Sequence, residues 1–286
     1  MAKLPDIKDP TLVAMDEAIE AAQDTTRRGY LGASSIGHPC ARALWYGFRW
    51  ARPVKFSAGT LKNFEDGHRG EDLMASRLQN TPGITISTHS PEGGQWGISD
   101  HEGHFRGHCD GFIKGLVQAP KTPHVWEHKV CNEKKQAQLV KLKTEKGEKE
   151  ALAHWDEVYY AQAQVYMHYF DMTRHYLTCS SPGERSTVSV RTNYNRTHAE
   201  ALVKRAKDII VSDQPPVRLS EDSTFYRCKW CDYHSICHDI TPMQKNCRTC
   251  AYSYPDRDGA WSCNKHGALP ADKQREGCDD FSEIAA

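Results

Sequence analysis

Two neighbouring stretches of the chain, His104–Lys114 and His124–Val130, alternate residue types with the two-residue period of a β-strand. In the first stretch, the polar residues that share one face end at Asp110. In the second, Glu127 and Lys129 lie on a single face. If the two strands pair as a hairpin, these three side chains converge. The chain is therefore expected to form a small sheet with a carboxylate and amine cluster at one place.

Segments with helical periodicity lie before and after these two stretches in the sequence. A glycine- and serine-rich break, Gly29–Gly37, separates the first two expected helices. The segment Lys134–Glu150 is polar and rich in lysine, and a cysteine-rich tail follows Pro215-Pro216. The expected helices are Pro10–Arg28, Pro39–Trp50, Ser57–Leu78, His154–Phe170 and His198–Val211, and the further expected strands are Ile84–His89, Arg174–Cys179 and Thr187–Thr192.

Composition indicates a globular protein whose charges are balanced. The 286 residues are 38% hydrophobic, and 37 basic residues match 37 acidic ones. A nucleic acid would therefore have to be held by local basic patches and not by a global field. No apolar run is long enough to cross a bilayer, and the N-terminus lacks the apolar stretch of a signal peptide. We expect a cytoplasmic protein with no membrane partner.

A cluster of Asp110, Glu127 and Lys129 suits metal-assisted cleavage of a phosphodiester bond. Carboxylate oxygens hold Mg²⁺ or Mn²⁺, and an amine orients or deprotonates the attacking water. The same residue types also occur as a surface ion pair, which is the commoner meaning of an isolated match. Further elements of the sequence must decide between the two.

Two helical patterns add to the cluster. His68 and Glu71 are three residues apart in the helix before the sheet, so they share a face. His68 is a candidate metal ligand, and Glu71 would either orient His68 or contact metal-bound water. Gln162 and Tyr166 are four residues apart in the helix after the sheet, where they form either an aromatic packing stripe or part of a site.

The order His68, Asp110, Glu127-His128-Lys129, then Gln162 and Tyr166, resembles the motif series of the RecB-like nucleases. It is most similar to the CRISPR-associated iron–sulfur exonucleases and their phage-encoded relatives, over about Leu31 to Cys237. The resemblance implies an α/β fold with a restriction-endonuclease-like PD-(D/E)XK core, a small mixed sheet flanked by helices. It also implies a magnesium or manganese site formed by His68, Asp110, Glu127 and the backbone carbonyl of His128. Lys129 would complete the catalytic core, with Gln162 and Tyr166 positioning DNA.

A first group of cysteines, Cys228, Cys231 and Cys237, has the spacing of ligands for zinc or an iron–sulfur cluster. His234 and His238 lie close by in the sequence, so zinc remains an alternative to an iron–sulfur cluster for this group. The family that the chain resembles takes a fourth ligand from upstream, which matches Cys40. The resemblance therefore implies a [4Fe–4S] cluster that clasps the two ends of the core.

A second group, Cys247, Cys250, Cys263 and Cys278, lies in the last 40 residues. One tight pair with two further cysteines predicts a structural zinc knuckle, because so short a tail buries little apolar surface without a metal. A second iron–sulfur cluster and free thiols are the alternatives. The remaining cysteines, Cys109, Cys131 and Cys179, have no evident partners and are expected to be small buried hydrophobes.

DNA contacts are expected on both sides of the cluster. Seven lysines and three glutamates lie from Lys129 to Lys149, and such a run is either a solvated face or a track for phosphates. In addition to Lys134 and Lys135 of this run, Ser34, Ser35 and Arg42 are candidate phosphate contacts. No motif that reads bases is evident.

The sequence thus predicts a metal-dependent DNA exonuclease without strong sequence specificity, acting on single-stranded or end-resected DNA. Its setting would be phage or prokaryotic recombination, repair or replication, with proteins of those processes as further partners. The alternatives are a non-catalytic DNA-binding or assembly module and a nuclease of CRISPR spacer acquisition. The expected division is an N-terminal helical region (1–56), the nuclease core (57–215), the iron–sulfur segment (216–240) and the zinc-knuckle tail (241–286).

Overall fold

A mixed five-stranded sheet forms the centre of the protein in the computed structural model, which describes residues 9–239 and 241–284. The strand order is β2-β5-β6-β7-β8. β6 and β7 are parallel, and the other neighbouring pairs are antiparallel. Parallel strands need a long crossover, which helices α4, α5 and α6 provide. The strands are β2 (Thr85–Ser87), β5 (Gly111–Lys114), β6 (His124–Val130), β7 (Arg174–Ser180) and β8 (Thr187–Asn193).

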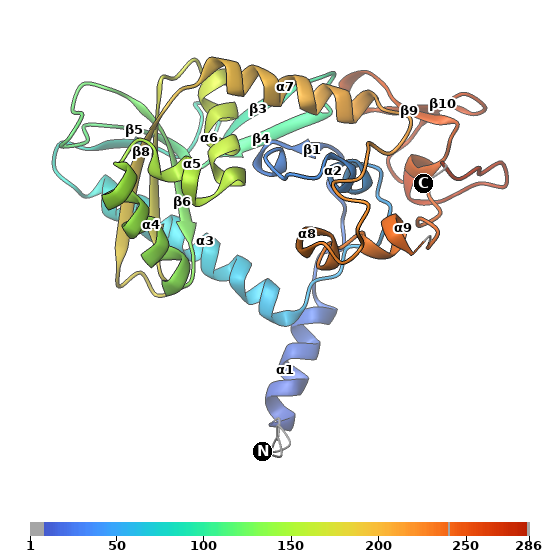
Figure 1. The fold of residues 1–286 in the computed structure, drawn as a ribbon, viewed down its shortest axis with the longest axis horizontal. Coiled ribbons are helices and arrows are strands. Elements are labelled where there is room, and N and C mark those ends of the chain that lie inside the picture. Colours follow the sequence, from blue (N-terminus) through green and yellow to red (C-terminus); the bar gives the residue numbers. More distant parts are fainter. Residues whose placement is uncertain (1–8, 240, 285–286) are drawn as a thin grey trace.

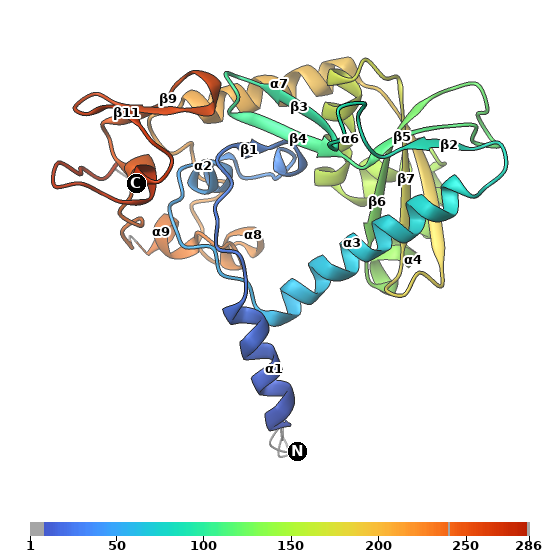
Figure 2. The ribbon, with the colours of Figure 1, turned by 180° about the vertical axis from the view of Figure 1, so that it is seen from behind.

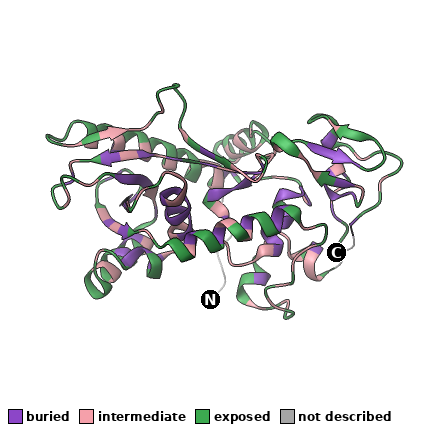
Figure 3. Ribbon diagram, turned by 90° about the horizontal axis from the view of Figure 1, so that it is seen from above, coloured by how far each residue is buried: buried purple, intermediate pink, exposed green. Residues whose placement is uncertain are grey.

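Helices cover both faces of this sheet, so its central strands are largely buried (Figures 1 and 3). On one face, α3 packs through Met74 against Ile113, Trp126 and Tyr176. The main hydrophobic core lies on the other face and extends from Val125 to the helices of the crossover. The helices are α1 (Pro10–Ala21), α2 (Ala41–Phe48), α3 (Ala58–Gln79), α4 (Glu133–Lys146), α5 (Ala151–Trp155), α6 (Glu157–Tyr169), α7 (Arg196–Val211), α8 (Tyr226–Lys229) and α9 (His234–His238).

Two smaller sheets lie beside the centre. One has the order β1-β4-β3, and the other is the antiparallel sheet β11-β10-β9 of the C-terminal region. Helix α1 projects from the body, whereas α3 runs diagonally to the large sheet (Figure 2). None of the helices in the described ranges is both long and apolar enough to span a bilayer. The additional strands are β1 (Leu31–Gly32), β3 (Trp96–Asp100), β4 (Phe105–Cys109), β9 (Ser253–Pro255), β10 (Trp261–Cys263) and β11 (Gly267–Leu269), and 3₁₀ turns occupy Ala33–Ser35, Cys247–Thr249, Arg257–Gly259 and Lys273–Arg275.

The mixed α/β class is as predicted, but several element boundaries were wrong. The expected strand His104–Lys114 is divided into β4 and β5, which belong to different sheets. The expected helix His154–Phe170 is two helices, because the side chain of Asp156 accepts hydrogen bonds from the backbone of Val158 and Tyr159 and starts α6 anew. The first helix ends at Ala21, not at Arg28.

Candidate active site

Asp110 lies where the chain passes from β4 to β5. Gly111 makes this transition possible, since its φ is +155° and a Cβ there would lie 2.5 Å from the carbonyl oxygen of Ser87. Asp110 Oδ2 accepts a hydrogen bond of 2.7 Å from the backbone N–H of His128. The antiparallel pairing of Gly111 with Trp126 places Asp110 opposite Glu127. The predicted hairpin is therefore present and brings the two carboxylates together.

Glu127 is at the centre of the cluster and is only 1% exposed. Its Oε2 accepts hydrogen bonds from Lys129 Nζ at 2.8 Å and from Gln162 Nε2 at 3.1 Å. Its Oε1 is buried and has no hydrogen-bond partner among the described residues. A buried carboxylate oxygen without a partner is costly. This oxygen is therefore available to a ligand.

A third carboxylate, Glu71, reaches the cluster from α3. Burial, together with the nearby Asp110 carboxylate, raises the pKa of Glu71 to about 7. Burial and the same neighbour raise the pKa of Glu127 to about 8, and burial raises the pKa of Asp110 as well. Burial alone would lower the pKa of Lys129, but the carboxylates of Glu127 and Asp110 outweigh it and raise that pKa. Three carboxyl groups thus share a buried site with one lysine, and without a further cation they retain protons more readily than free carboxyl groups do.

His68 lies one turn before Glu71 on the same helix. It is exposed, and within the described ranges it makes no hydrogen bond or ion pair. Glu71 is thus the α3 residue that interacts with the cluster: the Asp110 carboxylate raises the pKa of Glu71, and the Glu71 carboxylate contributes to the raised pKa of Glu127.

Gln162 and Tyr166, the residues expected on α6, both lie at the site but make different contacts. Gln162 holds the Glu127 carboxylate. Tyr166 is 1% exposed, and its hydroxyl donates a 2.7 Å hydrogen bond to the carbonyl of His108. Gly107 permits this approach, because a Cβ there would lie 2.9 Å from the Tyr166 hydroxyl. Tyr166 thus fixes β4 two residues before Asp110, as a packing residue does.

The imidazole of His128 points away from the carboxylates, to the α3 face of β6. Its Nδ1 lies 2.9 Å from Thr178 Oγ1, and its Nε2 lies 3.0 Å from Ser180 Oγ and 3.1 Å from Glu184 Oε1. Glu184 is in turn paired with Arg77 of α3. Burial lowers the pKa of His128 to about 4. This network, which the sequence analysis missed, ties the strand that carries Glu127 to the helix that carries Glu71.

The candidate phosphate contacts are scattered. Lys134 and Ser34 are exposed. Lys135 forms a 2.7 Å ion pair with Asp156. Ser35 donates a hydrogen bond to the carbonyl of Gly32. Arg42 is buried, and its guanidinium donates to Tyr46 and to the carbonyl of Pro216, so its charge faces the protein interior.

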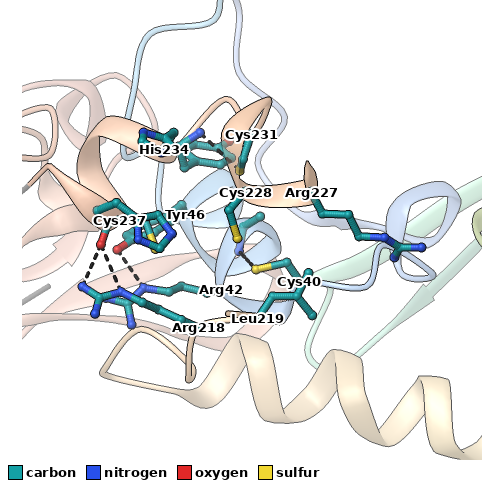
Figure 4. A pocket seen from close by; sticks show the side chains of 13 residues that line it. Cys40, Arg42, Tyr46, Arg218, Leu219, Arg227, Cys228, Cys231, His234 and Cys237 are labelled. Carbon is teal, nitrogen blue, oxygen red and sulfur yellow. Dashed lines mark hydrogen bonds between the residues drawn. The ribbon is translucent and has the colours of Figure 1, made fainter. Parts of the chain in front are cut away.

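The first group of cysteines lines one pocket. Cys40 at the start of α2 faces Cys228, Cys231 and Cys237 (Figure 4). Within the described residues, no three of their sulfurs lie within 4.8 Å of one another. Sulfurs bound to one zinc ion are about 3.8 Å apart, given a Zn–S bond of about 2.3 Å. His234 and His238 also line this pocket.

The second group of cysteines, Cys247, Cys250, Cys263 and Cys278, lines a separate pocket in the C-terminal region. The backbone N–H of Lys265 donates a hydrogen bond to Cys263 Sγ. No three of these four sulfurs lie within 4.8 Å of one another in the described chain, whereas donor atoms of His266, Cys278 and Asp280 do. His266 was not anticipated, although its spacing from Cys263 as C-x2-H is a signal that could have found it.

Two of the three remaining cysteines are neighbours, contrary to expectation. The sulfurs of Cys131 and Cys179 lie 3.0 Å apart at the ends of β6 and β7. The parallel register of these strands, which the sequence did not reveal, brings them together. Cys109 is fully buried, as predicted.

No protein-family model matches the chain, and no curated protein matches it. Among solved structures, the chain is similar to the protein SSO0001 at 14% identity with a TM-score of 0.42, over 80% of this chain and 96% of that one. It is similar to an alkaline exonuclease from Laribacter hongkongensis at 14% identity with a TM-score of 0.43, over 68% and 90% of the two chains. A phage-related exonuclease from Haemophilus somnus is similar at 13% identity with a TM-score of 0.36, over 52% and 69%. At such TM-scores these likenesses carry no argument about function.

Proposed function

We propose that the protein is a metal-dependent deoxyribonuclease, an exonuclease that hydrolyses phosphodiester bonds without strong sequence specificity. One observation carries the proposal. Three carboxylates, Glu71, Asp110 and Glu127, gather around a lysine, and one buried oxygen of Glu127 has no hydrogen-bond partner among the described residues. A divalent cation would complete this arrangement, because it balances the charge and occupies the free oxygen.

Asp110 and Glu127 would hold Mg²⁺ or Mn²⁺, with the carbonyl of His128 beside them. Glu71 would contact the ion or a water molecule bound to it; contact with such a water is one of the two roles expected from the sequence. The role of His68 as a metal ligand stays a prediction. When bound, the ion would stabilise the charge that develops on the scissile phosphate and lower the pKa of the attacking water.

Lys129 would act as a cation and hydrogen-bond donor. Its raised pKa keeps it protonated near neutral pH. It is therefore suited to orienting water or phosphate and not to removing a proton. Gln162 keeps the Glu127 carboxylate in place, and Tyr166 keeps the β4 to β5 transition in place. These two residues act on the ligands and are positioning residues.

We further propose a [4Fe–4S] cluster on Cys40, Cys228, Cys231 and Cys237. The four cysteines come from two distant segments and line one pocket, as a cluster that joins those segments requires. The cluster would clasp α2 to the segment that follows α7. For the C-terminal group, a structural zinc ion on Cys247, Cys250, Cys263 and Cys278 remains our proposal, with His266 as an additional candidate ligand.

DNA end-labelled on either strand provides the test. Purified protein should release short labelled products from single-stranded or duplex DNA with Mg²⁺ or Mn²⁺ and should release none in chelator. A circular single strand without ends serves as the control, and an exonuclease should leave it intact. Cleavage of the circle would show an endonuclease, and absence of any metal-dependent cleavage would refute the proposed function.

A further inference from the structure

We propose that a cleft next to the candidate active site binds a single strand of DNA and leads it to Asp110 and Glu127. We call it the arginine cleft. It lies between the segment 26–35, α2, the loop before α3 and the α8–α9 turn, and its lining includes Arg28, Tyr30, Arg52, Arg227 and Trp230. The inference rests on the proposed function and adds a binding surface to it.

Charge in the arginine cleft favours a polyanion. Its lining includes four arginines, Arg27, Arg28, Arg52 and Arg227, and among the described lining residues Asp232 is the only carboxylate. Arg52 pairs with Asp232, and Arg227 pairs with Glu157 outside the cleft, both at partly exposed positions. Exposed ion pairs of this kind contribute little, so a phosphate can replace the carboxylate at small cost.

Aromatic rings accompany these charges. Trp230 is 81% exposed, and the Lys229 ammonium lies 5.4 Å from its ring centre. The ring of Tyr30 lies against two guanidinium groups, Arg28 at 5.4 Å and Arg106 at 5.7 Å from its centre. Aromatic faces beside phosphate-binding cations are the surface that unpaired bases stack on. A duplex keeps its bases stacked on each other, so this surface favours a single strand.

Trp230 belongs to the same turn as the first cysteine group. It stands between Cys228 and Cys231, and it lines the arginine cleft and not the pocket that these cysteines line with Cys40. A large exposed ring on so short a turn has no packing role to explain it. The proposed cluster would therefore have a second consequence, since it fixes a stacking platform as well as the fold.

The arginine cleft is connected to the site through β1 and β4. Gly32 in β1 pairs with Arg106 in β4, and a Cβ on Gly32 would meet the guanidinium of Arg28. Arg28 therefore lies against β1, which neighbours β4, the strand that ends one residue before Asp110. Asp110 is four positions along the chain from Arg106, which is about 13 Å at about 3.3 Å per residue. A DNA strand lying on Arg28 and Tyr30 would therefore reach the active-site carboxylates within a few nucleotides.

The test measures the binding of a fluorescent single-stranded oligonucleotide by anisotropy, with Glu127→Gln protein in chelator so that no cleavage intervenes. Arg28→Glu should weaken binding at least about tenfold and reduce the salt dependence, since each lost phosphate contact lowers the slope of log K against log salt by about 0.7. Trp230→Ala should weaken binding about fivefold or more without changing that slope. Trp230→Phe should restore most of the loss, because it retains a ring.

Matched controls separate the cleft from a general effect. Lys207→Glu on α7 and Tyr254→Ala on β9 change an exposed lysine and an exposed aromatic outside the cleft, and both should bind as the parent does. Wild-type affinity in both Arg28→Glu and Trp230→Ala would overturn the proposal that the arginine cleft binds single-stranded DNA. So would equal losses in the controls, or a duplex oligonucleotide that binds as tightly as the single strand. Because binding is measured without cleavage, these outcomes are distinguishable from a failure of the proposed nuclease activity.

Discussion

Around Glu127 the chain itself supplies a hydrophobic core and two hydrogen-bond donors, whereas around Cys228 it supplies very little. The strand that carries Glu127 is buried along most of its length. By contrast, Cys228 and Ile236 are the buried residues of the described segment 216–239. From this difference we expect that the carboxylate site forms before any ion binds, whereas the segment around Cys228 depends on its proposed cluster for a stable fold. Loss of ligands should therefore affect chemistry in the first region and stability in the second.

The largest effect is expected from the carboxylate cluster. Asp110→Ala should reduce metal-dependent cleavage to background, and Lys129→Ala should reduce it by about 10² to 10⁴-fold. The effects should not add in the double variant, since the residues act as a unit. Single-turnover cleavage measures the loss, and unfolding midpoints check that the fold is kept. Near wild-type cleavage by Asp110→Ala would show that Asp110 is not part of the catalytic site.

The next effect concerns the cysteine pockets and should appear in stability. Anaerobically purified protein should be brown, with about four irons and one zinc per chain. Cys40→Ser should bleach it and lower the unfolding midpoint by more than about 5 °C, because the clasp between α2 and the later segment is lost. Cys263→Ser should remove zinc and leave the colour. Colourless anaerobic protein that carries two zinc ions would show that the iron–sulfur proposal is wrong.

A smaller loss of activity is expected for substitutions of Gln162 and Tyr166, which position the carboxylate cluster. Gln162→Ala should cost about 10 to 100-fold in activity or in metal affinity, because it frees the Glu127 carboxylate. Tyr166→Phe should cost less, since it removes one hydrogen bond to the His108 carbonyl and leaves the ring packed. Titration with Mn²⁺ separates weaker ion binding from slower cleavage. Unchanged values in both variants would assign the pair to packing alone.

The residues of the carboxylate cluster could be predicted from sequence because strand periodicity and chain order set them. Alternation placed Glu127 and Lys129 on one face, and hairpin pairing placed Asp110 opposite. Contacts that depend on three-dimensional closeness were not predictable in this way. The Glu184 contact to His128 and the approach of Cys131 to Cys179 both follow from the parallel register of β6 and β7, for which the sequence has no local signal.

The division at Asp110 was missed for a related reason. A single run of alternating residues predicted one strand, but Gly111 has a positive φ and starts a strand of another sheet. The glycine was visible in the sequence, although its backbone conformation was not. Likewise, the burial of Glu71 and its closeness to Asp110 could not be predicted, because both arise from how α3 packs on the sheet.

A further effect is a pH dependence of stability in metal-free protein. Glu127 has a pKa raised from its usual 4.5 to about 8, so the folded state retains a proton that the unfolded state has lost. Stability should therefore fall as pH rises from about 4.5 to 8. Glu127→Gln should remove part of this decline, and Mg²⁺ should offset it at the upper end. Chemical denaturation of both proteins at several pH values, compared as a difference, measures it. Parallel curves would contradict the raised pKa.

The comparison between the two regions is tested most directly by adding a chelator of divalent ions to brown, active protein and following cleavage, colour and fold together. We predict that cleavage of end-labelled DNA stops at once and returns with Mg²⁺ or Mn²⁺, while the iron colour and the unfolding midpoint of the core persist. Glu127→Gln protein should keep the colour and show no cleavage with either ion. Cleavage that continues in chelator, or that Glu127→Gln retains, would contradict the assignment of this carboxylate cluster as the catalytic metal site.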